Sequence, residues 1–338
     1  MNIQQAIARV VDGNDLSHDN MQSVMQQIMT GACTDAQIGG LLIALRMKGE
    51  TVDEISAAAE VMVALAEPVE VAQNNLIDIV GTGGDGTSTF NVSTAAAFVA
   101  AGAGARVAKH GNRSVSSNSG SADVLEAAGA NLELPAAQVA RVIDNAGVGF
   151  MFAPMHHSAM KHAIGARKQM AVRTIFNVLG PLTNPARVKR QVVGVFAAGL
   201  TEKLAAVFQQ LGSEHTLVVH SEDGMDEISI CAPTRISELR NGAITTYTVA
   251  PEDFGLGRAQ LADIVAADAD ESLAMLQAVL AGKAGAARDI VALNAGAGIY
   301  VAGLAESLAE GVEKALESMD SGRALAAKKA YVKASCET

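Results

Sequence analysis

Short apolar runs alternate with helical patterns from residue 76 onward, and this alternation restricts the fold more than any other feature of the sequence. The candidate strands are 77–80, 106–108, 192–195, 216–219, 227–231 and 243–249. Helical patterns such as 94–101 and 200–211 lie between them. Parallel strands need long crossover connections, which are usually helices. The sequence therefore predicts an α/β domain with a central, mostly parallel sheet.

The first 66 residues contain helical patterns only. Thr34 and Thr51 each begin a capping box, with Gln37 and Glu54 three residues later; in such a box two side chains satisfy free backbone amides of the first turn. An apolar stripe at helical spacing precedes them: Met21, Val24, Met25, Ile28 and Met29. Methionine stripes usually belong to cores, so we interpret this one as packing rather than as a ligand surface. These features predict a small helical domain over residues 1–70.

The segment 153–184 interrupts the alternation. It is rich in His, Lys, Arg and Met, and it contains the Gly180-Pro181 turn. Its pattern is that of a helix followed by a loop, and we expect residues of about 155–190 to join the N-terminal helical layer. The α/β domain then comprises residues 71–154 and 191–338.

Composition argues against several classes of protein. The net charge of −11 and the pI near 5.1 oppose binding to nucleic acid or to an anionic membrane. Cys33, Cys231 and Cys336 are too scattered for a metal site or a disulfide framework, which favours a reducing compartment. No apolar run of about 18 residues is present, and the first residues do not resemble a signal peptide. We therefore predict a cytoplasmic protein.

The stretch VGTGGDGTSTFN (80–91) follows an apolar run and matches G-x-G-x-x-G at Gly81, Gly83 and Gly86. A dinucleotide site needs a helix that begins within the glycines and an acid about 20 residues on. Here a helix cannot begin before Ser93, and the later region holds cations instead: Arg106, Lys109, His110 and Arg113. No lysine follows the glycines, so a P-loop is absent too. What remains is a loop of amides and hydroxyls suited to an anion, or a tight surface turn.

Two further motifs favour the anion. Residues 109–121 place Lys109, His110 and Arg113 among hydroxyl side chains at the end of another predicted strand. Such loops at neighbouring strand ends converge on one crevice, and together they indicate a polyphosphate ligand. Asp226 and Glu227 lie in a turn before a predicted strand, where paired carboxylates suit Mg²⁺ bound to phosphate oxygens, although a solvated turn is the alternative.

Arg167 and a group of three histidines remain ambiguous on residue chemistry alone. A guanidinium is a natural partner for a carboxylate, but Arg167 has the alternative of an ordinary surface position. His156, His157 and His162 suggest a metal, yet no carboxylate at a suitable spacing supports one.

With these residues assembled, the chain resembles the anthranilate phosphoribosyltransferases of tryptophan biosynthesis over nearly its whole length. The shared motifs are GTGGDGTSTFNVST (81–94), KHGNRSVSSNSGSADVLEAAG (109–129), RTIFNVLGPLTNP (173–185) and GMDEIS (224–229). The resemblance implies the fold of the pyrimidine nucleoside phosphorylases, with a discontinuous helical domain, an α/β domain and a cleft between them. It also implies a homodimer that forms through the helical domain.

The resemblance assigns roles to residues that match the motifs. It implies that the substrates are anthranilate and 5-phosphoribosyl 1-diphosphate (PRPP), with Mg²⁺ as cofactor. The implied PRPP contacts are Gly81, Gly84, Asp85, Thr89, Asn91, Val92, Ser93, Thr94, Lys109, His110, Gly111, Asn112, Arg113, Ser114, Val115, Ser116, Ser117 and Ser121. The implied anthranilate contacts are Gly81, His110, Asn112, Arg167, Gly180 and Pro181. The implied magnesium ligands are Ser93, Asp226 and Glu227, and the implied catalytic residues are Asp85, Lys109 and His110.

The sequence departs from the family around Arg167, where members commonly have a proline shortly before the arginine and Glu-Leu-Gly after it. Here the stretch reads Gly165-Ala166-Arg167-Lys168-Gln169-Met170-Ala171. Two other functions are compatible with parts of the sequence. One is a pyrimidine nucleoside phosphorylase, which would need a site for free phosphate and a nucleobase. The other is a non-catalytic relative that binds nucleic acid, which the acidic pI and the magnesium acids oppose.

Overall fold

The computed structural model describes residues 1–114 and 119–337. Four helices form the N-terminal part: α1 (Ile3–Val11), α2 (His18–Met29), α3 (Asp35–Lys48) and α4 (Val52–Leu65). The capping boxes predicted at Thr34 and Thr51 are present, because each threonine accepts from the backbone of Gln37 or Glu54. The predicted stripe on α2 is buried from Met21 to Met29, so it packs a core.

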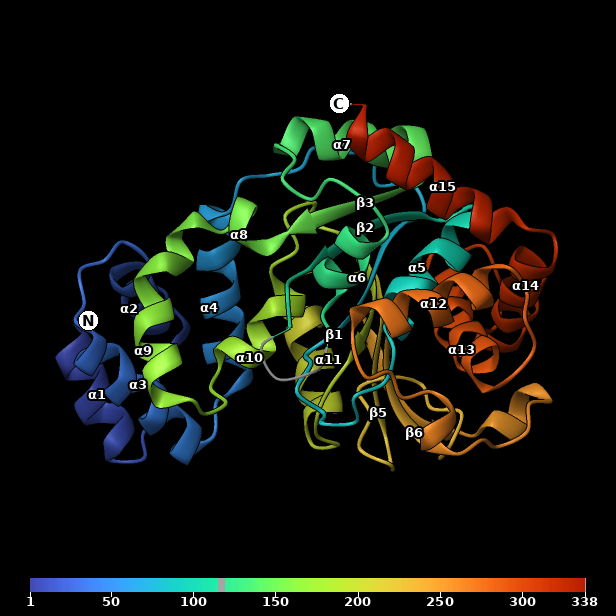
Figure 1. Ribbon diagram of the computed structural model, residues 1–338. Helices are drawn as coiled ribbons and strands as arrows, with labels where there is room; N and C mark the ends of the chain where they lie inside the picture. Colours follow the sequence, from blue (N-terminus) through green and yellow to red (C-terminus); the bar gives the residue numbers. More distant parts are fainter. Residues whose placement is uncertain (115–118, 338) are drawn as a thin grey trace.

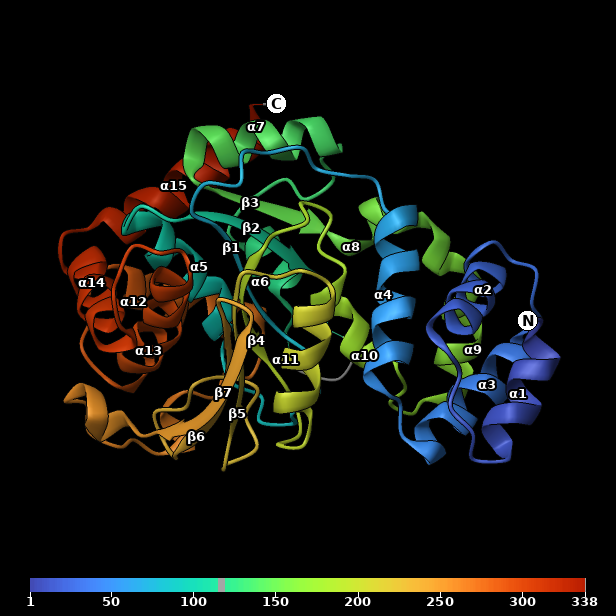
Figure 2. The same ribbon diagram turned by 180° about the vertical axis from the view of Figure 1, so that it is seen from behind.

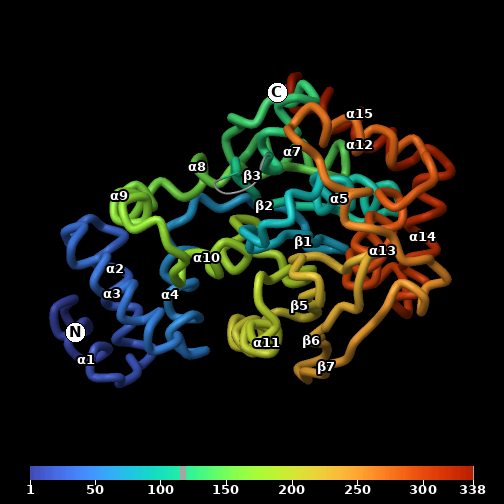
Figure 3. The backbone as a smooth tube through the Cα atoms, turned by 60° about the horizontal axis from the view of Figure 1, so that its bottom comes forward, coloured from blue at the N-terminus to red at the C-terminus, as the bar shows by residue number. Residues whose placement is uncertain are grey.

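Three helices follow in the middle of the chain, and the second and third of them contact this layer. They are α8 (Ala153–His156), α9 (Lys161–Met170) and α10 (Phe176–Leu179). Figure 1 shows α9 beside α2 and α3, and the tube in Figure 3 shows the same neighbours from another direction. The segment that interrupts the strand pattern therefore returns to the N-terminal helices.

A seven-stranded sheet lies at the centre of the larger part, in the order β3-β2-β1-β4-β5-β6-β7. Its strands are β1 (Leu76–Gly81), β2 (Arg106–Gly111), β3 (Val148–Phe152), β4 (Arg190–Gly194), β5 (His215–Ser221), β6 (Thr234–Arg240) and β7 (Ala243–Val249). β1 to β5 pair in parallel, and β6 and β7 extend the sheet as an antiparallel pair. The predicted α/β fold with a mostly parallel sheet and a helical N-terminal domain is confirmed.

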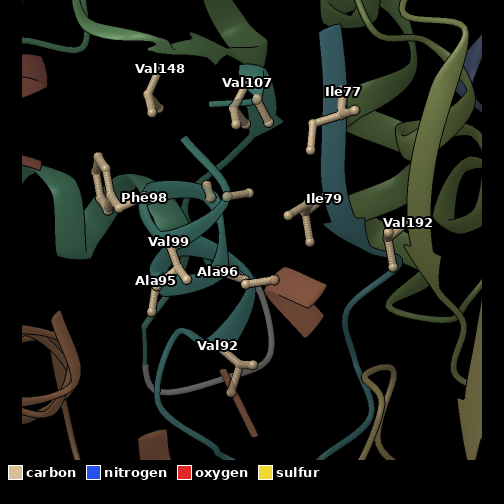
Figure 4. Packing of buried hydrophobic residues seen from close by; sticks show 14 of the residues in the cluster. Ile77, Ile79, Val92, Ala95, Ala96, Phe98, Val99, Val107, Val148 and Val192 are labelled. Carbon is tan, nitrogen blue, oxygen red and sulfur yellow. The ribbon is translucent and has the colours of Figure 1, made fainter. Parts of the chain in front are cut away.

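Helices cover both faces of the sheet. The helices are α5 (Val92–Gly102), α6 (Ser121–Ala127), α7 (Ala136–Ala146), α11 (Leu200–Gln210), α12 (Ala269–Leu280), α13 (Ala286–Val301), α14 (Leu308–Asp320) and α15 (Arg323–Cys336). Ile77 and Ile79 of β1 point toward α5, where Ala96 and Val99 pack (Figure 4). Seen from behind, α11 lies between the sheet and α4 (Figure 2). Among the described residues, no helix has the length and apolar character needed to span a bilayer.

Several expected elements differ from the structure. The strand predicted over 227–231 is wrong, since this segment is irregular and its backbone bonds to side chains. β3 and β6 were not predicted, because β3 is uniformly apolar and β6 alternates with charged residues. Lys109, His110 and Gly111 lie within β2 rather than in the loop after it.

Candidate active site

The polar motifs meet at the carboxyl edge of the sheet. β1 is followed by residues 82–91, here called the glycine loop, and β5 is followed by residues 222–231, here called the acid segment. The strand order reverses between β1 and β4, because β2 and β3 lie on one side of β1 while β4 and β5 lie on the other. Ligands of open α/β sheets bind at this position, where the loops of neighbouring strands diverge.

Asp226 lies against the ends of β1 and β4. Its Oδ2 accepts a hydrogen bond of 2.7 Å from the backbone N–H of Gly83. Gly81 and Gly194 are paired in register at this point, and a Cβ atom on either would overlap Asp226, its side chain in one case and its backbone in the other. Both positions must therefore be glycine for the acid segment to approach the sheet this closely.

Three carboxyl groups repel one another here. Burial, together with the charge of Asp85, raises the pKa of Asp226 to about 6. Burial and the charge of Asp226 raise the pKa of Glu227 well above its usual value, although Lys109 and the Ser93 backbone N–H oppose this shift. A divalent cation at this point would relieve the repulsion and keep the carboxylates ionised.

Lys109 extends from β2 beneath these acids. Its buried Nζ donates to the carbonyl oxygen of Ile79 at 2.6 Å and to Ser93 Oγ at 3.2 Å. Burial lowers the pKa of Lys109, while the charges of Asp78 and Glu227 oppose that shift. The lysine therefore connects β1, the first turn of α5 and the acid segment.

Asp78 and Asn184 form a buried pair below Lys109 that the sequence analysis did not identify. Asn184 Nδ2 donates to Asp78 Oδ2 at 2.8 Å and to the carbonyl oxygen of Ala108 at 2.9 Å. Burial raises the pKa of Asp78 to about 6, and Lys109 opposes the shift. A charged residue inside the apolar run 76–80 is the sequence signal that would have revealed it, since such a residue needs a partner.

His110 lies beside the Gly180-Pro181 turn, and the distance from its Nδ1 to the carbonyl oxygen of Gly180 is 3.2 Å. Its ring centroid is 5.0 Å from that of His157. Burial, with His157 adding to the effect, lowers the pKa of His110 to about 3, so the ring is neutral. Within the described part of the chain, His110 Nε2 has no hydrogen-bond partner.

The glycine loop is held by one contact within it and by two contacts to other segments. Asp85 accepts hydrogen bonds from the Thr87 hydroxyl at 2.6 Å and the Thr87 N–H at 3.3 Å. The Arg173 guanidinium contacts the Gly84 carbonyl oxygen and stacks 4.4 Å over the ring of Phe196. Thr89 forms a bridge with Val265. The end of the glycine loop therefore pairs with the segment around Val265, which belongs to none of the sequence motifs.

The loop after β2 meets the glycine loop near α5. Asn91 Nδ2 donates to Ser119 Oγ at 3.0 Å, and the Ser121 hydroxyl donates to the Asn112 carbonyl oxygen at 3.4 Å. Arg113 turns away and forms a bidentate pair with Glu126 at 2.7 and 2.9 Å. Val115, Ser116 and Ser117, which the family resemblance assigns to PRPP, lie outside the described residues.

These residues suit a magnesium ion whose coordination shell water and phosphate oxygens would complete. Among residues 1–114 and 119–337, no three His, Cys, Asp or Glu side chains form a ready-made metal site. Mg²⁺ commonly uses one or two protein carboxylates and completes its shell with water and phosphate oxygens. Asp226 and Glu227, with their raised pKa values, provide such a pair, and Ser93 lies near both Lys109 and Glu227.

Comparisons with known proteins agree with this arrangement. The family description "Glycosyl transferase family, helical bundle domain" matches residues 4–66, and "Glycosyl transferase family, a/b domain" matches residues 73–325. The anthranilate phosphoribosyltransferase of Teredinibacter turnerae is 59% identical over 328 residues and covers 96% of both chains. This chain belongs to the anthranilate phosphoribosyltransferase family.

Solved structures of this family share the whole fold. The Thermus thermophilus anthranilate phosphoribosyltransferase is 42% identical, with a TM-score of 0.93 over 98% of this chain and 99% of that one. The Saccharomyces cerevisiae member, described in complex with PRPP and Mg, is 27% identical, with a TM-score of 0.90 over 99% and 98% of the two chains. The sheet and the helical layer are therefore features of the family.

The segment in which this chain departs from the family pattern lies on α9. Gly165 lies so close to Asp35 of α3 that a Cβ would be 2.9 Å from the carboxylate, and Gln169 Nε2 donates to the same carboxylate at 3.2 Å. Arg167 turns the other way, 5.1 Å over the ring of Phe176, and burial lowers its pKa. The departures thus lie where α9 meets α3, while Arg167 faces α10.

Proposed function

We propose that this protein transfers the 5-phosphoribosyl group of PRPP to the amine of anthranilate and releases diphosphate, a reaction of tryptophan biosynthesis. The observation that best supports this function is the gathering of Asp226, Glu227 and Lys109 beneath the glycine loop, at the reversal of strand order. Two carboxyl groups beside a buried lysine suit a magnesium diphosphate. The named relatives carry out the transfer that their name describes.

The chain's own residues would act mainly by binding and positioning. Asn91, Ser93 and Thr94 lie at the N-terminus of α5, where free amides and the helix dipole favour an anion. The reaction builds positive charge on the ribose and negative charge on the diphosphate, and anthranilate's neutral amine needs no strong base. Asp226, Glu227 and Ser93 would hold Mg²⁺, which neutralises the diphosphate. Asp85, through its bonds to Thr87, would orient the glycine loop.

The remaining PRPP contacts also belong to this proposal. Lys109 lies within reach of Ser93, and the loop that starts at Gly111 meets Asn91 through Ser119. These two contacts support one continuous phosphoribosyl site. Its further members are Gly81, Gly84, Thr89, Val92, His110, Asn112, Arg113, Ser114, Val115, Ser116, Ser117 and Ser121. Arg113 is paired with Asp123 and Glu126, so a phosphate would compete with these two carboxylates for its guanidinium.

The anthranilate site is proposed at the boundary between the sheet and α9–α10. Gly81, His110, Asn112, Gly180 and Pro181 would surround the ring, and Arg167 would bind the carboxylate. A neutral His110 can form a hydrogen bond without adding charge beside an uncharged amine. Loss of hydration makes Arg167 a stronger partner for a carboxylate.

The proposal also covers the domain bounds and the assembly of the protein. The helical domain would comprise residues 1–70 with about 155–190, the α/β domain the remainder, with the substrate cleft between them. A cytoplasmic homodimer would form through the helical domain. Met47 on α3 and Ile164 on α9 are exposed apolar side chains on this layer, which suits a contact between two copies.

A direct assay tests the function. Anthranilate fluorescence should fall when PRPP and Mg²⁺ are added to the protein, and it should persist when either is withheld. Glu227→Gln should lower this turnover by about 100-fold or more, because the neutral side chain cannot balance the metal's charge. Glu222→Gln is the matched control, since Glu222 is exposed in the same segment. Phosphorolysis of a pyrimidine nucleoside with no use of anthranilate would contradict the proposal.

A further inference from the structure

The acid segment is buried without being part of a strand. Met225, Ile228 and Ile230 are each at most 1% exposed, yet residues 222–231 lie outside the strands of the sheet. Buried backbone amides and carbonyls need hydrogen-bond partners, and strand pairing does not supply them here. The N–H groups of Ser221 and Ala259 donate to the carbonyl oxygens of Met225 and Ile230, and side chains hold the backbone between these two points, directly after the two acids.

Asn294 supplies the partners at the residue directly after Glu227. Its Oδ1 accepts from the Ile228 N–H at 2.9 Å, and its Nδ2 donates to the Ile228 carbonyl oxygen at 2.9 Å. The same Nδ2 donates to the Ile290 carbonyl oxygen, one turn earlier on α13. Asn294 is fully buried. One carboxamide therefore replaces both hydrogen bonds that a neighbouring strand would have made.

Helix α13 is itself held rigidly against the strand that leads into the glycine loop. A Cβ on Gly298 would lie 2.6 Å from Ile79 of β1, and a Cβ on Gly296 would lie 2.6 Å from the backbone of Val312 on α14. These two glycines let α13 pack closely on both neighbours. The position of Asn294 relative to the end of β1 is fixed by this packing, so Asn294 can transmit it to the acid segment.

The rest of the acid segment has its own supports. Thr234 Oγ1 accepts from the Ser229 N–H at 3.0 Å, and the Ser229 hydroxyl donates to Asp223 at 2.6 Å. These contacts close the segment on itself and onto β6. Asn294 differs because it ties the segment to a helix on the other side of the core, next to the two acids.

We propose that Asn294 is a positioning residue for the metal–diphosphate site: its carboxamide fixes Ile228 and so directs the carboxylates of Asp226 and Glu227 toward one point. This inference rests on the proposed function. Neighbours that orient metal ligands typically change metal affinity or activity by about 10- to 100-fold when they are removed.

The test compares Asn294→Ala with Ser318→Ala. Ser318 is equally buried and donates to the Val99 carbonyl oxygen at 2.8 Å, which joins α14 to α5 without contacting the acid segment. Mn²⁺ serves as a spectroscopic probe and is titrated in the presence of PRPP by electron paramagnetic resonance. Asn294→Ala should weaken Mn²⁺ binding by about 10-fold or more, whereas Ser318→Ala should leave it within about twofold.

Two further readouts separate positioning from general loss of structure. In Asn294→Ala, hydrogen exchange should accelerate in peptides from the acid segment, and KM for anthranilate should stay within about twofold while kcat/KM for PRPP falls by about 10-fold or more. If Asn294→Ala does not fold, Asn294→Ser, which keeps one hydrogen-bonding group, takes its place. Mn²⁺ affinity, hydrogen exchange and kcat/KM for PRPP should then change in the same directions but by smaller factors.

Equal Mn²⁺ affinity and equal exchange in the two folded variants would overturn the role of Asn294. That result leaves the proposed function intact if the unaltered protein still consumes anthranilate with PRPP and Mg²⁺. Failure of the unaltered protein to do so would refute the proposed function instead, and the Mn²⁺ comparison would still decide whether Asn294 directs the acids.

Discussion

At the scale of single residues, the site is a set of charges that burial makes costly and that stabilise one another. Lys109 lies between Asp78 and Glu227, and each carboxyl opposes the desolvation that lowers the lysine's pKa. Asp78 in turn is bonded by Asn184. A buried charge without a partner costs several kcal/mol, so removing one member changes the others. The effect of replacing any of these charged residues should therefore depend on pH.

Asp78→Asn should change how stability depends on pH. Burial raises the pKa of Asp78 from 3.8 to about 6, so its contribution to stability is full below about pH 4 and is lost as the pH rises through about 6. An asparagine does not ionise, so the stability of the variant lacks this decrease. From pH 4 to pH 7 the variant should therefore gain about 1–3 kcal/mol relative to the unaltered protein.

Urea unfolding of both chains at several pH values measures this difference. Asp226 and Glu227 titrate in both chains, so subtracting the two curves removes the part of their contribution that does not depend on Asp78. A difference that does not vary with pH would show that Asp78 is ionised over the whole range. Turnover should also fall, because Lys109 loses one of its two acidic neighbours.

Arg167→Ala should raise KM for anthranilate by about 10- to 100-fold, the loss expected when a charge-assisted hydrogen bond of about 1.5–3 kcal/mol is removed. KM for PRPP should change by less than about threefold, since the proposed role of Arg167 is confined to the carboxylate. Steady-state kinetics with each substrate varied in turn give both values. Lys168→Ala is the control, because Lys168 is the exposed neighbour on the same helix. Equal changes in the two KM values would contradict the carboxylate role.

At the scale of elements, the site depends on how closely irregular segments approach the ends of strands. Gly81 of β1 and Gly194 of β4 are paired, and the acid segment passes directly over them. Such an approach needs glycine because any side chain would fill the space that Asp226 occupies. The ends of two strands and one loop therefore form a single structural unit.

Gly194→Ala should damage this unit, because the new methyl group would overlap the Asp226 backbone. We expect a loss of about 1–3 kcal/mol of stability and at least a tenfold loss of magnesium-dependent turnover. Gly199→Ala is a matched control: its Cβ would meet nothing within 4 Å, and its φ of −65° suits alanine. That variant should stay within about 1 kcal/mol of the unaltered protein. Chemical denaturation and the fluorescence assay measure both, and equal effects of the two variants would refute the close approach.

Local patterns in the sequence predicted the elements that have a regular period or a clear cap. The capping boxes of α3 and α4 and strands β1, β4, β5 and β7 are examples. The acid segment was mistaken for a strand because Ile228 and Ile230 alternate with polar residues, whereas its real partner, Asn294, lies 66 residues away. Asp78 is marked locally, as an acid inside an apolar run, but its partner Asn184 is not, since a contact across 106 residues leaves no local pattern.

The motifs, by contrast, were visible because backbone chemistry limits which residues can surround a phosphate. Glycines 81 to 86 and the hydroxyls of Ser93 and Thr94 fit that chemistry without any knowledge of distant contacts. The sequence could not show that Arg113 pairs with Glu126 or that Arg173 contacts Gly84. Such contacts depend on which of several nearby partners a flexible cation meets in the folded chain.

At the scale of the whole molecule, the helical layer and the sheet share one hydrophobic core. Leu41 and Leu45 of α3 belong to the same buried cluster as Leu204 of α11, Val193 of β4 and Val218 of β5. Ser56 of α4 also donates to Gln210 of α11 at 2.7 Å. The two family matches, 4–66 and 73–325, therefore meet at a packed core rather than at a flexible linker. Domains joined in this way usually unfold together.

A single substitution in the helical layer should therefore lower the melting point of the whole chain. The three tyrosines, Tyr247, Tyr300 and Tyr331, all lie in the α/β part, and the chain has no tryptophan, so tyrosine emission reports that part alone. Leu41 is fully buried on α3, and Leu41→Ala should cost about 2–5 kcal/mol. The melting midpoint from tyrosine emission should fall by the same amount as the midpoint from far-ultraviolet circular dichroism, measured at one protein concentration.

Val11→Ala provides the control for this experiment, since Val11 lies on α1 of the same helical layer but is 69% exposed. Its two midpoints should not move by more than about 1 °C, because exposed side chains contribute little to stability. If Leu41→Ala lowered the circular dichroism midpoint and left tyrosine emission unchanged, the helical layer would unfold on its own. The proposed site would then depend on the docking of two independently folding domains, the helical layer and the α/β part, rather than on one shared core.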